Sequence, residues 1–391
     1  MILYFWLVIF FIAQILSGMP GQMLNSAWPT MYKVVNAPET NLAILQGAFL
    51  LVTTFSLAFS AILKKKIGAR NLCGIGLLLL GIGIAMYSVS TKFSICIIAS
   101  SIIGLSCGFV DMISNFYLTM YYSKTLHAWM NCCWGLGSSL GAFIVSIVLA
   151  RGYDYRVAFK IVIPVIFVLA LVIFIVRYFD DKKRTDYLNK QDSSYDKKDD
   201  HIYSEVFKKK NILLYFMCLF MANFMLHTNC TWLPTYSVNM HRVDIAVAAS
   251  FVSILFGTLA ICRFFSGIIV KFFNAKIILL ICLVLYTIGS LILLIARDNI
   301  HLYYLACIIM GVGISPQYPL MISLSKEFFG EKNLDAIIGM ATSFAQIGGF
   351  AGTTITGIIV NIFGFNSYLF VGVLAGILAI TIFNLLKRRA K

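Results

Sequence analysis

Long apolar segments follow one another along the whole chain, and they limit the possible folds more than any other feature. We count twelve, each about 20 residues or longer, the length that an α-helix needs to cross about 30 Å of hydrocarbon. They cover approximately residues 4–32, 41–63, 70–90, 94–121, 127–150, 157–178, 211–238, 245–270, 277–296, 301–325, 334–362 and 366–386. The composition agrees, since 60% of the residues are hydrophobic and 12% are charged. The chain is therefore predicted to be an all-α membrane protein with twelve transmembrane helices.

Lysine and arginine predict the orientation of these helices. The first apolar segment follows Met1 with no basic stretch before it, so we expect it to be retained as a span. With a cytoplasmic N-terminus, 23 of the 31 Lys and Arg residues fall on the cytoplasmic side, seven fall outside, and Arg263 lies within a segment. Cytoplasmic loops carry an excess of positive charge. Both termini are therefore predicted to be cytoplasmic, in an inner (plasma) membrane, and the net charge of +15 gives no reason to expect nucleic acid as a partner.

One long polar stretch divides the twelve segments into six and six. It mixes both signs of charge and has few apolar residues, which is typical of a solvated linker. The predicted domains are an N-terminal six-helix bundle at 1–179, a cytoplasmic linker at 180–210 and a C-terminal six-helix bundle at 211–391.

The two halves share sequence features. Lys124 lies nine positions after Asn115, just past the fourth segment, and Lys326 lies nine positions after Gln317, just past the tenth. The fifth segment of each half is rich in glycine. Such similarities between the halves are typical of transporters that arose by duplication of a six-helix unit.

Asp111 is the one acidic residue, of sixteen, that lies inside a long apolar segment. An ionised, unpaired carboxylate in the bilayer costs several kcal/mol, so we expect Asp111 to face an interior cavity. It is the first candidate for proton coupling. The alternative is a structural acid, held protonated in a hydrogen bond between helices or paired with a cation.

Four motifs resemble the major facilitator superfamily, and more narrowly its sugar:proton symporters, the branch of the L-fucose and glucose/mannose permeases. They are GLSCGFVDMISN (104–115), NCCWGLGSSLGAF (131–143), TWLPTY (231–236) and GVGISPQYPLMISLSKEFFG (311–330). The resemblance implies two pseudo-symmetric six-helix bundles, transport by alternating access, and a coupling acid at the position of Asp111. The chain departs from the branch at Lys65, where Asp is expected, at Asn131, where His is common, and in the first segment, which has no acid.

Amide and aromatic side chains make up the predicted substrate site. Asn115 lies one helical turn after Asp111, on the same face. Amides both donate to and accept from hydroxyl groups, and an indole offers a stacking face, so the set suits a neutral polyhydroxylated solute. Each residue has an alternative role in helix–helix contact or packing. The predicted substrate-binding residues are Asn115, Asn131, Trp134, Asn223, Gln317, Tyr318, Gln346 and Gln14.

His227 and four further residues complete the candidates. His227 is a second candidate for proton coupling, since imidazole titrates near neutral pH, but it could equally contact substrate or be structural. Pro234 is expected to break or bend its helix near the outer end, and Pro316 and Pro319 to disrupt the tenth segment. Arg263 is predicted to be a gating or capping residue.

The function predicted from these observations is secondary active transport of a small neutral polar solute such as a sugar, with proton symport. Two alternatives stay open: a proton-driven exporter of hydrophobic compounds such as drugs, and a transporter-like receptor that does not move its ligand. No enzyme activity, cofactor or metal is expected, because no nucleophile–base pair or ligand cluster occurs, and the ten cysteines are interpreted as small buried apolar residues. The expected partners are the solute, protons and the bilayer, and the expected state is a monomer.

Overall fold

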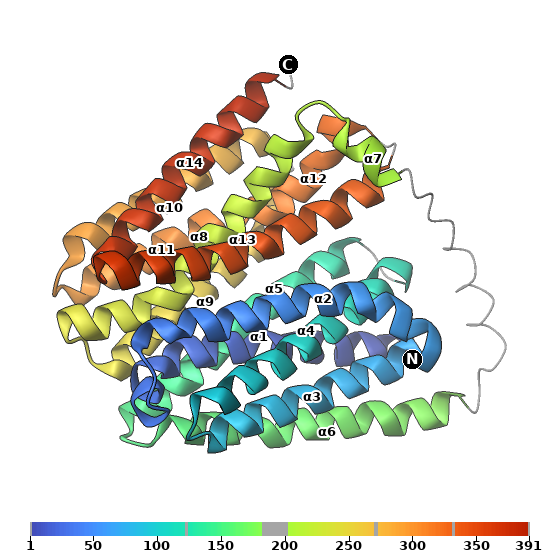
Figure 1. The fold of residues 1–391 in the computed structure, drawn as a ribbon. Coiled ribbons are helices and arrows are strands. Elements are labelled where there is room, and N and C mark those ends of the chain that lie inside the picture. The colour runs from blue at the N-terminus through green and yellow to red at the C-terminus, as the bar shows by residue number, and fades with distance from the viewer. Residues whose placement is uncertain (1, 122–123, 182–201, 270–272, 331–332, 390–391) are drawn as a thin grey trace.

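The structure, a computed structural model, describes residues 2–121, 124–181, 202–269, 273–330 and 333–389. These residues form helices and connecting turns (Figure 1). The elements are α1 (Ile2–Val34), η1 (Glu39–Asn41), α2 (Leu42–Ile67), α3 (Ala69–Val89), α4 (Phe93–Tyr121), α5 (Lys124–Ala150), α6 (Tyr155–Asp181), α7 (Ile202–Phe207), α8 (Ile212–His241), α9 (Ile245–Ile269), α10 (Ala275–Ala296), α11 (Ile300–Ile314), α12 (Gln317–Phe329), α13 (Leu334–Phe363) and α14 (Ser367–Arg389).

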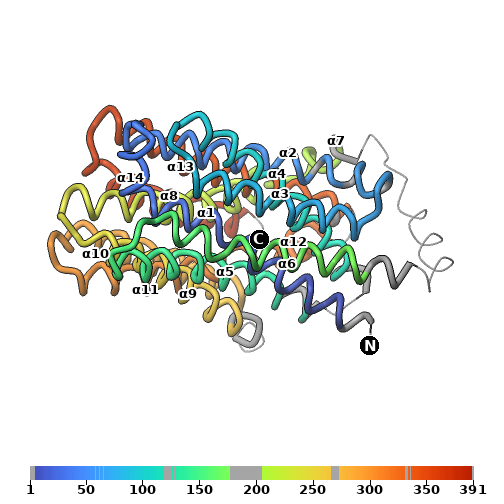
Figure 2. The backbone as a smooth tube through the Cα atoms, turned by 90° about the horizontal axis from the view of Figure 1, so that it is seen from below, coloured from blue at the N-terminus to red at the C-terminus, as the bar shows by residue number. Residues whose placement is uncertain are grey.

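The predicted twelve spans are confirmed. Among the described residues, twelve segments are long and apolar enough to cross a membrane, and one of them, Ile300–Phe329, combines α11 and α12. Figures 1 and 2 show the long helices running along one common direction. Of the predicted linker, residues 182–201 lie outside the described part of the chain, and the short helix α7 follows them.

The two ends of the bundle are named here by the chain segments that lie there. The linker end carries the start of α1, the end of α6 and the start of α8, while the far end carries the turns that follow α1, α3, α5, α8, α10 and α13 (Figure 1). Along α1 and α8 the residue number therefore increases from the linker end to the far end, and along α2 it decreases. This order fixes the relative depth of the side chains described below.

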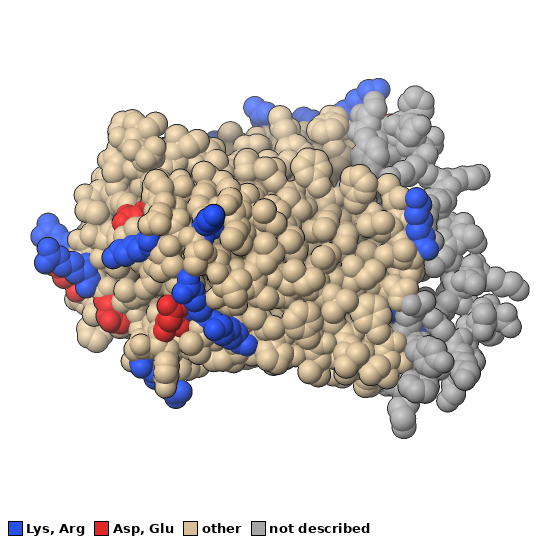
Figure 3. Space-filling model, turned by 60° about the horizontal axis from the view of Figure 1, so that its bottom comes forward, with Lys and Arg blue, Asp and Glu red and all other residues tan. Residues whose placement is uncertain are grey.

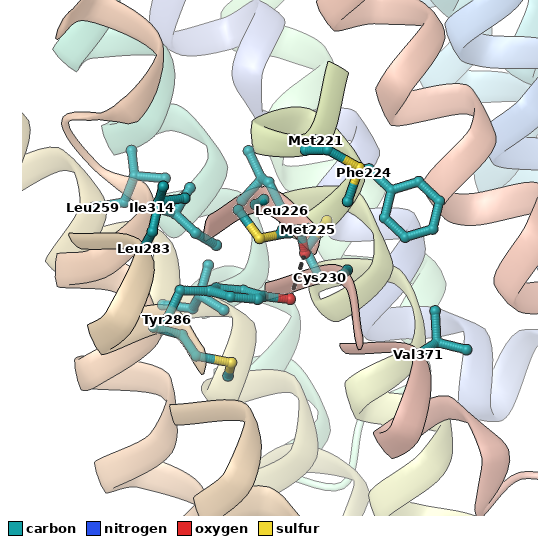
Figure 4. Close-up of a cluster of buried hydrophobic side chains, with 14 of the residues drawn as sticks. Met221, Phe224, Met225, Leu226, Cys230, Leu259, Leu283, Tyr286, Ile314 and Val371 are labelled. Atoms are coloured by element: carbon teal, nitrogen blue, oxygen red, sulfur yellow. Dashed lines mark hydrogen bonds between the residues drawn. The ribbon is translucent and has the colours of Figure 1, made fainter. Parts of the chain in front are cut away.

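Buried apolar side chains form two separate clusters. One extends from Trp6 to Ile173 with the single addition of Ala249. The other extends from Val206 to Leu386 and takes in only two residues of the first half, Ala43 and Ala142. Figure 4 shows part of the second cluster, where the Tyr286 hydroxyl points at the Met225 backbone carbonyl and donates to it at 3.3 Å. Each half of the chain therefore has its own core.

The surface between the two ends is apolar. Large side chains such as Phe55, Ile295 and Phe363 are 66%, 67% and 74% exposed. Figure 3 shows one face on which charged side chains gather toward the two ends and leave a broad band of uncharged residues. Exposure of this apolar band to water would be unfavourable, whereas lipid tails solvate it.

Glycine allows α5 to touch the backbone of α1. A Cβ added to Gly137 would overlap the carbonyl oxygen of Ile15, and one added to Gly141 would clash with the carbonyl oxygen of Met19. Both glycines lie one turn apart, as do the two carbonyls. This is the close approach that small residues permit in membrane helices.

The second half repeats this contact between α13 and α8. A Cβ at Gly348 would overlap the carbonyl oxygen of Phe220, and one at Gly352 would clash with that of Phe224. Again both pairs are four residues apart. The glycines that the sequence placed in the fifth span of each half thus have equivalent positions in the two halves.

Candidate functional site

A cavity of about 190 Å³ lies between the two halves. Helices α1, α2, α4 and α5 contribute one side, and α8, α9, α11, α12 and α13 contribute the other. Ten of the fourteen predicted site residues line it: Gln14, Asp111, Asn115, Asn131, Trp134, Asn223, His227, Arg263, Tyr318 and Gln346.

Asp111 of α4 is held by two side chains of α1. Gln14 Nε2 donates to Asp111 Oδ1 at 2.9 Å, and the Ser17 hydroxyl lies 3.5 Å from the same oxygen. The Gln14 Oε1 atom is buried and has no hydrogen-bond partner among the described residues. The carboxyl group is thus oriented by two neutral donors, and the amide beside it has an acceptor left for a ligand.

The N-terminal half adds amides and an indole to the cavity wall. Asn115 Nδ2 donates to the backbone carbonyl of Asp111 at 2.8 Å, so one of its donors is used within α4. Trp134 of α5 packs edge to face on Phe256 of α9, with ring centroids 5.7 Å apart. Asn131 lies one turn before Trp134 on the same helix. A solute in the cavity therefore meets polar atoms and an aromatic surface together.

His227 of α8 comes from the opposite half and is 7% exposed. Its ring packs on Gly349 of α13, where an added Cβ would come within 2.7 Å of Cδ2. Asn223, one turn earlier on α8, and Gln346 of α13 line the same cavity. The glycine at position 349 is thus what leaves room for the imidazole at the cavity wall.

A helix break places Arg263 in the site. Pro319 has no N–H to donate to the carbonyl of Ser315, four residues earlier, and Arg263 Nε donates to that carbonyl at 3.2 Å. The predicted disruption by Pro316 is confirmed, because α11 ends at Ile314 and α12 begins at Gln317. Arg263 therefore caps the break while it lines the cavity.

One residue predicted for the substrate site lies elsewhere. Gln317 does not line the cavity: it is 1% exposed, and its Nε2 donates to the carbonyl of Gly313 at 2.8 Å, so the helix break has taken its donor. At Pro234, where a break or a bend was expected, α8 continues unbroken to His241. Pro234, Pro316 and Pro319 are also outside the lining.

Several lining residues were missed. Ser17 lies three residues after Gln14, on the same face of α1, so helical spacing could have found it. Thr342 of α13 shares a hydrogen bond of 3.0 Å with the Tyr318 hydroxyl. The remainder carry no polar signal that separates them from ordinary core or lipid-facing residues: they are Phe49, Leu50, Leu57, Leu226, Ile314, Ala222 and Ala345, with Thr53 and Cys107 as weakly polar members.

Comparison with known proteins identifies the class of protein. The profile of the Major Facilitator Superfamily matches residues 10–271 and 243–391, so the chain belongs to this family. A crystal structure of a point mutant of the nucleoside transporter NupG superposes with a TM-score of 0.77 at 13% identity, covering 97% of this chain and 99% of that one. The fold is therefore the major facilitator fold.

Among relatives, the quinolone resistance protein NorA of Staphylococcus aureus (strain COL) is 24% identical over 367 residues, 90% of each chain. NorA of Staphylococcus aureus (strain N315) matches with the same identity and coverage. Family and fold together make this chain an integral, multi-pass secondary transporter and not an enzyme. The narrower likeness to the fucose and glucose/mannose symporters stays a prediction.

Proposed function

We propose that this transporter moves a small neutral, hydroxyl-bearing solute such as a sugar by alternating access, together with protons. The protein lies in the plasma membrane with its linker end on the cytoplasmic side, and it acts as a monomer. The observation that carries the proposal is the Asp111 carboxyl group in a cavity between the halves, held by Gln14 and Ser17. When Asp111 gains or loses a proton, the charge of the cavity changes. Proton binding and solute binding in this cavity are therefore linked.

The size and lining of the cavity support a small polar solute. Drug-sized ligands occupy pockets of about 300–1,000 Å³, whereas this cavity has about 190 Å³. The amides of Gln14, Asn131 and Gln346 suit hydroxyl groups, and the face of Trp134 suits the apolar face of a sugar or a planar base.

A second candidate is a proton-driven exporter of hydrophobic compounds. The likeness to NorA along 90% of the chain favours it. Apolar residues of the cavity wall, among them Phe49, Leu57 and Ile314, would contact such a compound. The two candidates predict proton flow in opposite directions relative to the solute.

The test is proton movement in proteoliposomes that contain a pH dye. D-glucose, L-fucose, uridine, L-serine and a quinolone are added outside in turn. Symport predicts that one polar solute acidifies the interior, while export by antiport predicts that the quinolone makes it more alkaline. Silence with all four polar solutes, together with a quinolone response, would replace the first candidate by the second.

Asp111→Asn is expected to abolish the proton signal and to leave solute counterflow measurable. The amide keeps an oxygen that accepts from Gln14 but has no proton to exchange at neutral pH. Asp298→Asn, at an acid that is 85% exposed at the far end, is the matched control and should change neither readout. Acidification by Asp111→Asn at the normal rate would show that Asp111 is structural.

A further inference from the structure

A chain of buried amides joins α1 to α2 directly beyond the cavity, on its far-end side. Asn25 Nδ2 donates to Gln22 Oε1 at 2.9 Å, and Gln46 Nε2 donates to Asn25 Oδ1 at 2.6 Å and to the Gly21 carbonyl at 3.0 Å. All three amides are at most 4% exposed. None of them lines the cavity, and the mechanism proposed above does not use them.

The amide chain lies where the two halves meet. Helix α1 packs against α8, and Gln22 of α1 lies close to the Cys230 thiol of α8. Gln22 follows the cavity residue Ser17 by five residues, and Cys230 follows His227 by three. At 1.5 Å of rise per residue, this contact lies about 5–8 Å beyond the cavity, toward the far end.

Two hydroxyl groups at the same depth and beyond have no partner. Ser26 Oγ of α1 and Thr235 Oγ1 of α8 are fully buried and make no hydrogen bond within the described part of the chain. An unsatisfied buried hydroxyl is unfavourable, so each of these needs a reason to persist. A partner that arrives only in another conformation supplies such a reason.

Polar side chains also continue along α8 from the cavity to the far end. Asn223, His227, Thr231, Thr235 and Asn239 follow one another at intervals of four residues, and the first two line the cavity. Asn239 donates to Glu39 Oε2 of η1, which closes the far end between the two halves. The polar surface thus runs along α8 from the solute site to this contact.

We propose that Gln22, Asn25 and Gln46, with the hydroxyls of Ser26 and Thr235, form a second binding step for the transported solute on the far-end side of the cavity. The inference rests on the proposed function, since it takes the same neutral, hydroxyl-bearing class of solute. In this conformation the amides bind one another and the step is closed. When α1 and α8 separate, these amides are uncovered, and solute hydroxyls can take the place of their present partners in α1 and α2, so one set of hydrogen bonds replaces another.

Helix α1 has a weak turn between the cavity and this second step. Pro20 has no N–H for the carbonyl of Leu16, and glycines at positions 18 and 21 flank it. The far-end part of α1, which carries Gln22, Asn25 and Ser26, can therefore move while Gln14 and Ser17 keep their contact with Asp111.

The test compares Asn25→Leu and Gln46→Leu with the unaltered protein, using radiolabelled D-glucose, L-fucose, uridine and L-serine. Equilibrium binding in detergent reports mainly on the cavity, while counterflow in proteoliposomes also requires the far end to open. We expect the counterflow KM to rise about five- to tenfold, as for a lost hydrogen bond, and the Kd to change less than about twofold. Unchanged KM values in both variants would overturn the inference.

Asn229→Leu is the matched control. Asn229 is a buried amide of α8 whose side chain bonds Tyr286 of α10 and Tyr368 of α14, inside the C-terminal half and away from the α1–α2 amides. The Asn229→Leu substitution should lower the stability of the protein and leave the counterflow KM unchanged. An equal rise of KM in this variant would show that loss of any buried amide has the effect, and would overturn the second binding step.

Thiol accessibility separates the inference from the proposed function. If the unaltered protein exchanges none of the four solutes, the proposed function is refuted. Ser26→Cys is then treated with a membrane-impermeant methanethiosulfonate, with the unaltered protein as background for the native cysteines. We expect Cys labelling at this position, slowed at least about twofold by the solute that is transported. No labelling, or labelling that no tested solute slows, would overturn the second binding step.

Discussion

Gly137→Ala is expected to prevent normal folding, although it adds a single methyl group. The new Cβ would overlap the Ile15 carbonyl oxygen, a backbone atom that cannot rotate away. Helices α1 and α5 would have to separate, and overpacking of this kind costs about 1–3 kcal/mol or more. We expect the yield of monodisperse protein in fluorescence-detected size-exclusion chromatography to fall several-fold.

The matched control is Gly339→Ala in α13. An added Cβ at that glycine meets nothing within 4 Å, and alanine favours a helix by about 1 kcal/mol over glycine. Yield and thermal stability should therefore be unchanged or higher. Gly348→Ala should repeat the defect of Gly137→Ala, since it faces the Phe220 carbonyl in the equivalent position of the second half. Normal yields for both interface variants would contradict the close packing described here.

Helix number and the central acid could be predicted because the bilayer imposes them. A span of apolar residues has few alternatives to a helix in hydrocarbon. A carboxylate such as Asp111 has few alternatives to an interior cavity. The same reasoning placed the amides of Asn115 and Gln346 inward, and the structure has both at the cavity wall.

Local backbone chemistry explains where the prediction of the site failed. Gln317 was placed in the site as the counterpart of Asn115, but the helix breaks between Ile314 and Gln317, and the Gln317 side chain donates to the Gly313 carbonyl beside this break. The similarity in sequence between the two halves does not predict a hydrogen bond of this kind at a helix break. Arg263 was predicted at a gate or cap, and its role as a cap brings it to the cavity wall as well.

The apolar part of the wall could not be predicted for a different reason. Leu50, Leu57 and Ile314 resemble the many leucines and isoleucines that face lipid or core. Which face of a helix lines the cavity depends on its rotation, and this is set by contacts with neighbouring helices. Glycine contacts such as that of Gly349 with His227 provide that information only once the fold is known.

A reversible block of transport is expected from the pair Ser139→Cys and Ser253→Cys. In the structure, Ser139 of α5 and Ser253 of α9 each donate to the backbone carbonyl of the other, at 2.8 Å and 3.1 Å, and their hydroxyl oxygens are 3.3 Å apart. Two thiols in these positions are within reach of a disulfide. The bond would join the N-terminal half to the C-terminal half.

Alternating access requires the far end to open, and α5 and α9 meet between the cavity and that end, where Ser146 also donates to the Ala246 carbonyl at 2.7 Å. The oxidised double variant should therefore bind solute in detergent but lose counterflow, and dithiothreitol should restore it. Each single variant and the oxidised unaltered protein, with its ten native cysteines, control for other thiol reactions. If fully cross-linked protein transports at the normal rate, the two helices do not separate at this level, and the motion that opens the far end must be confined to α1, α2, α8 and α13. The second binding step between α1 and α8 would then open without movement of α5, so the cross-link decides how much of the molecule takes part in each cycle.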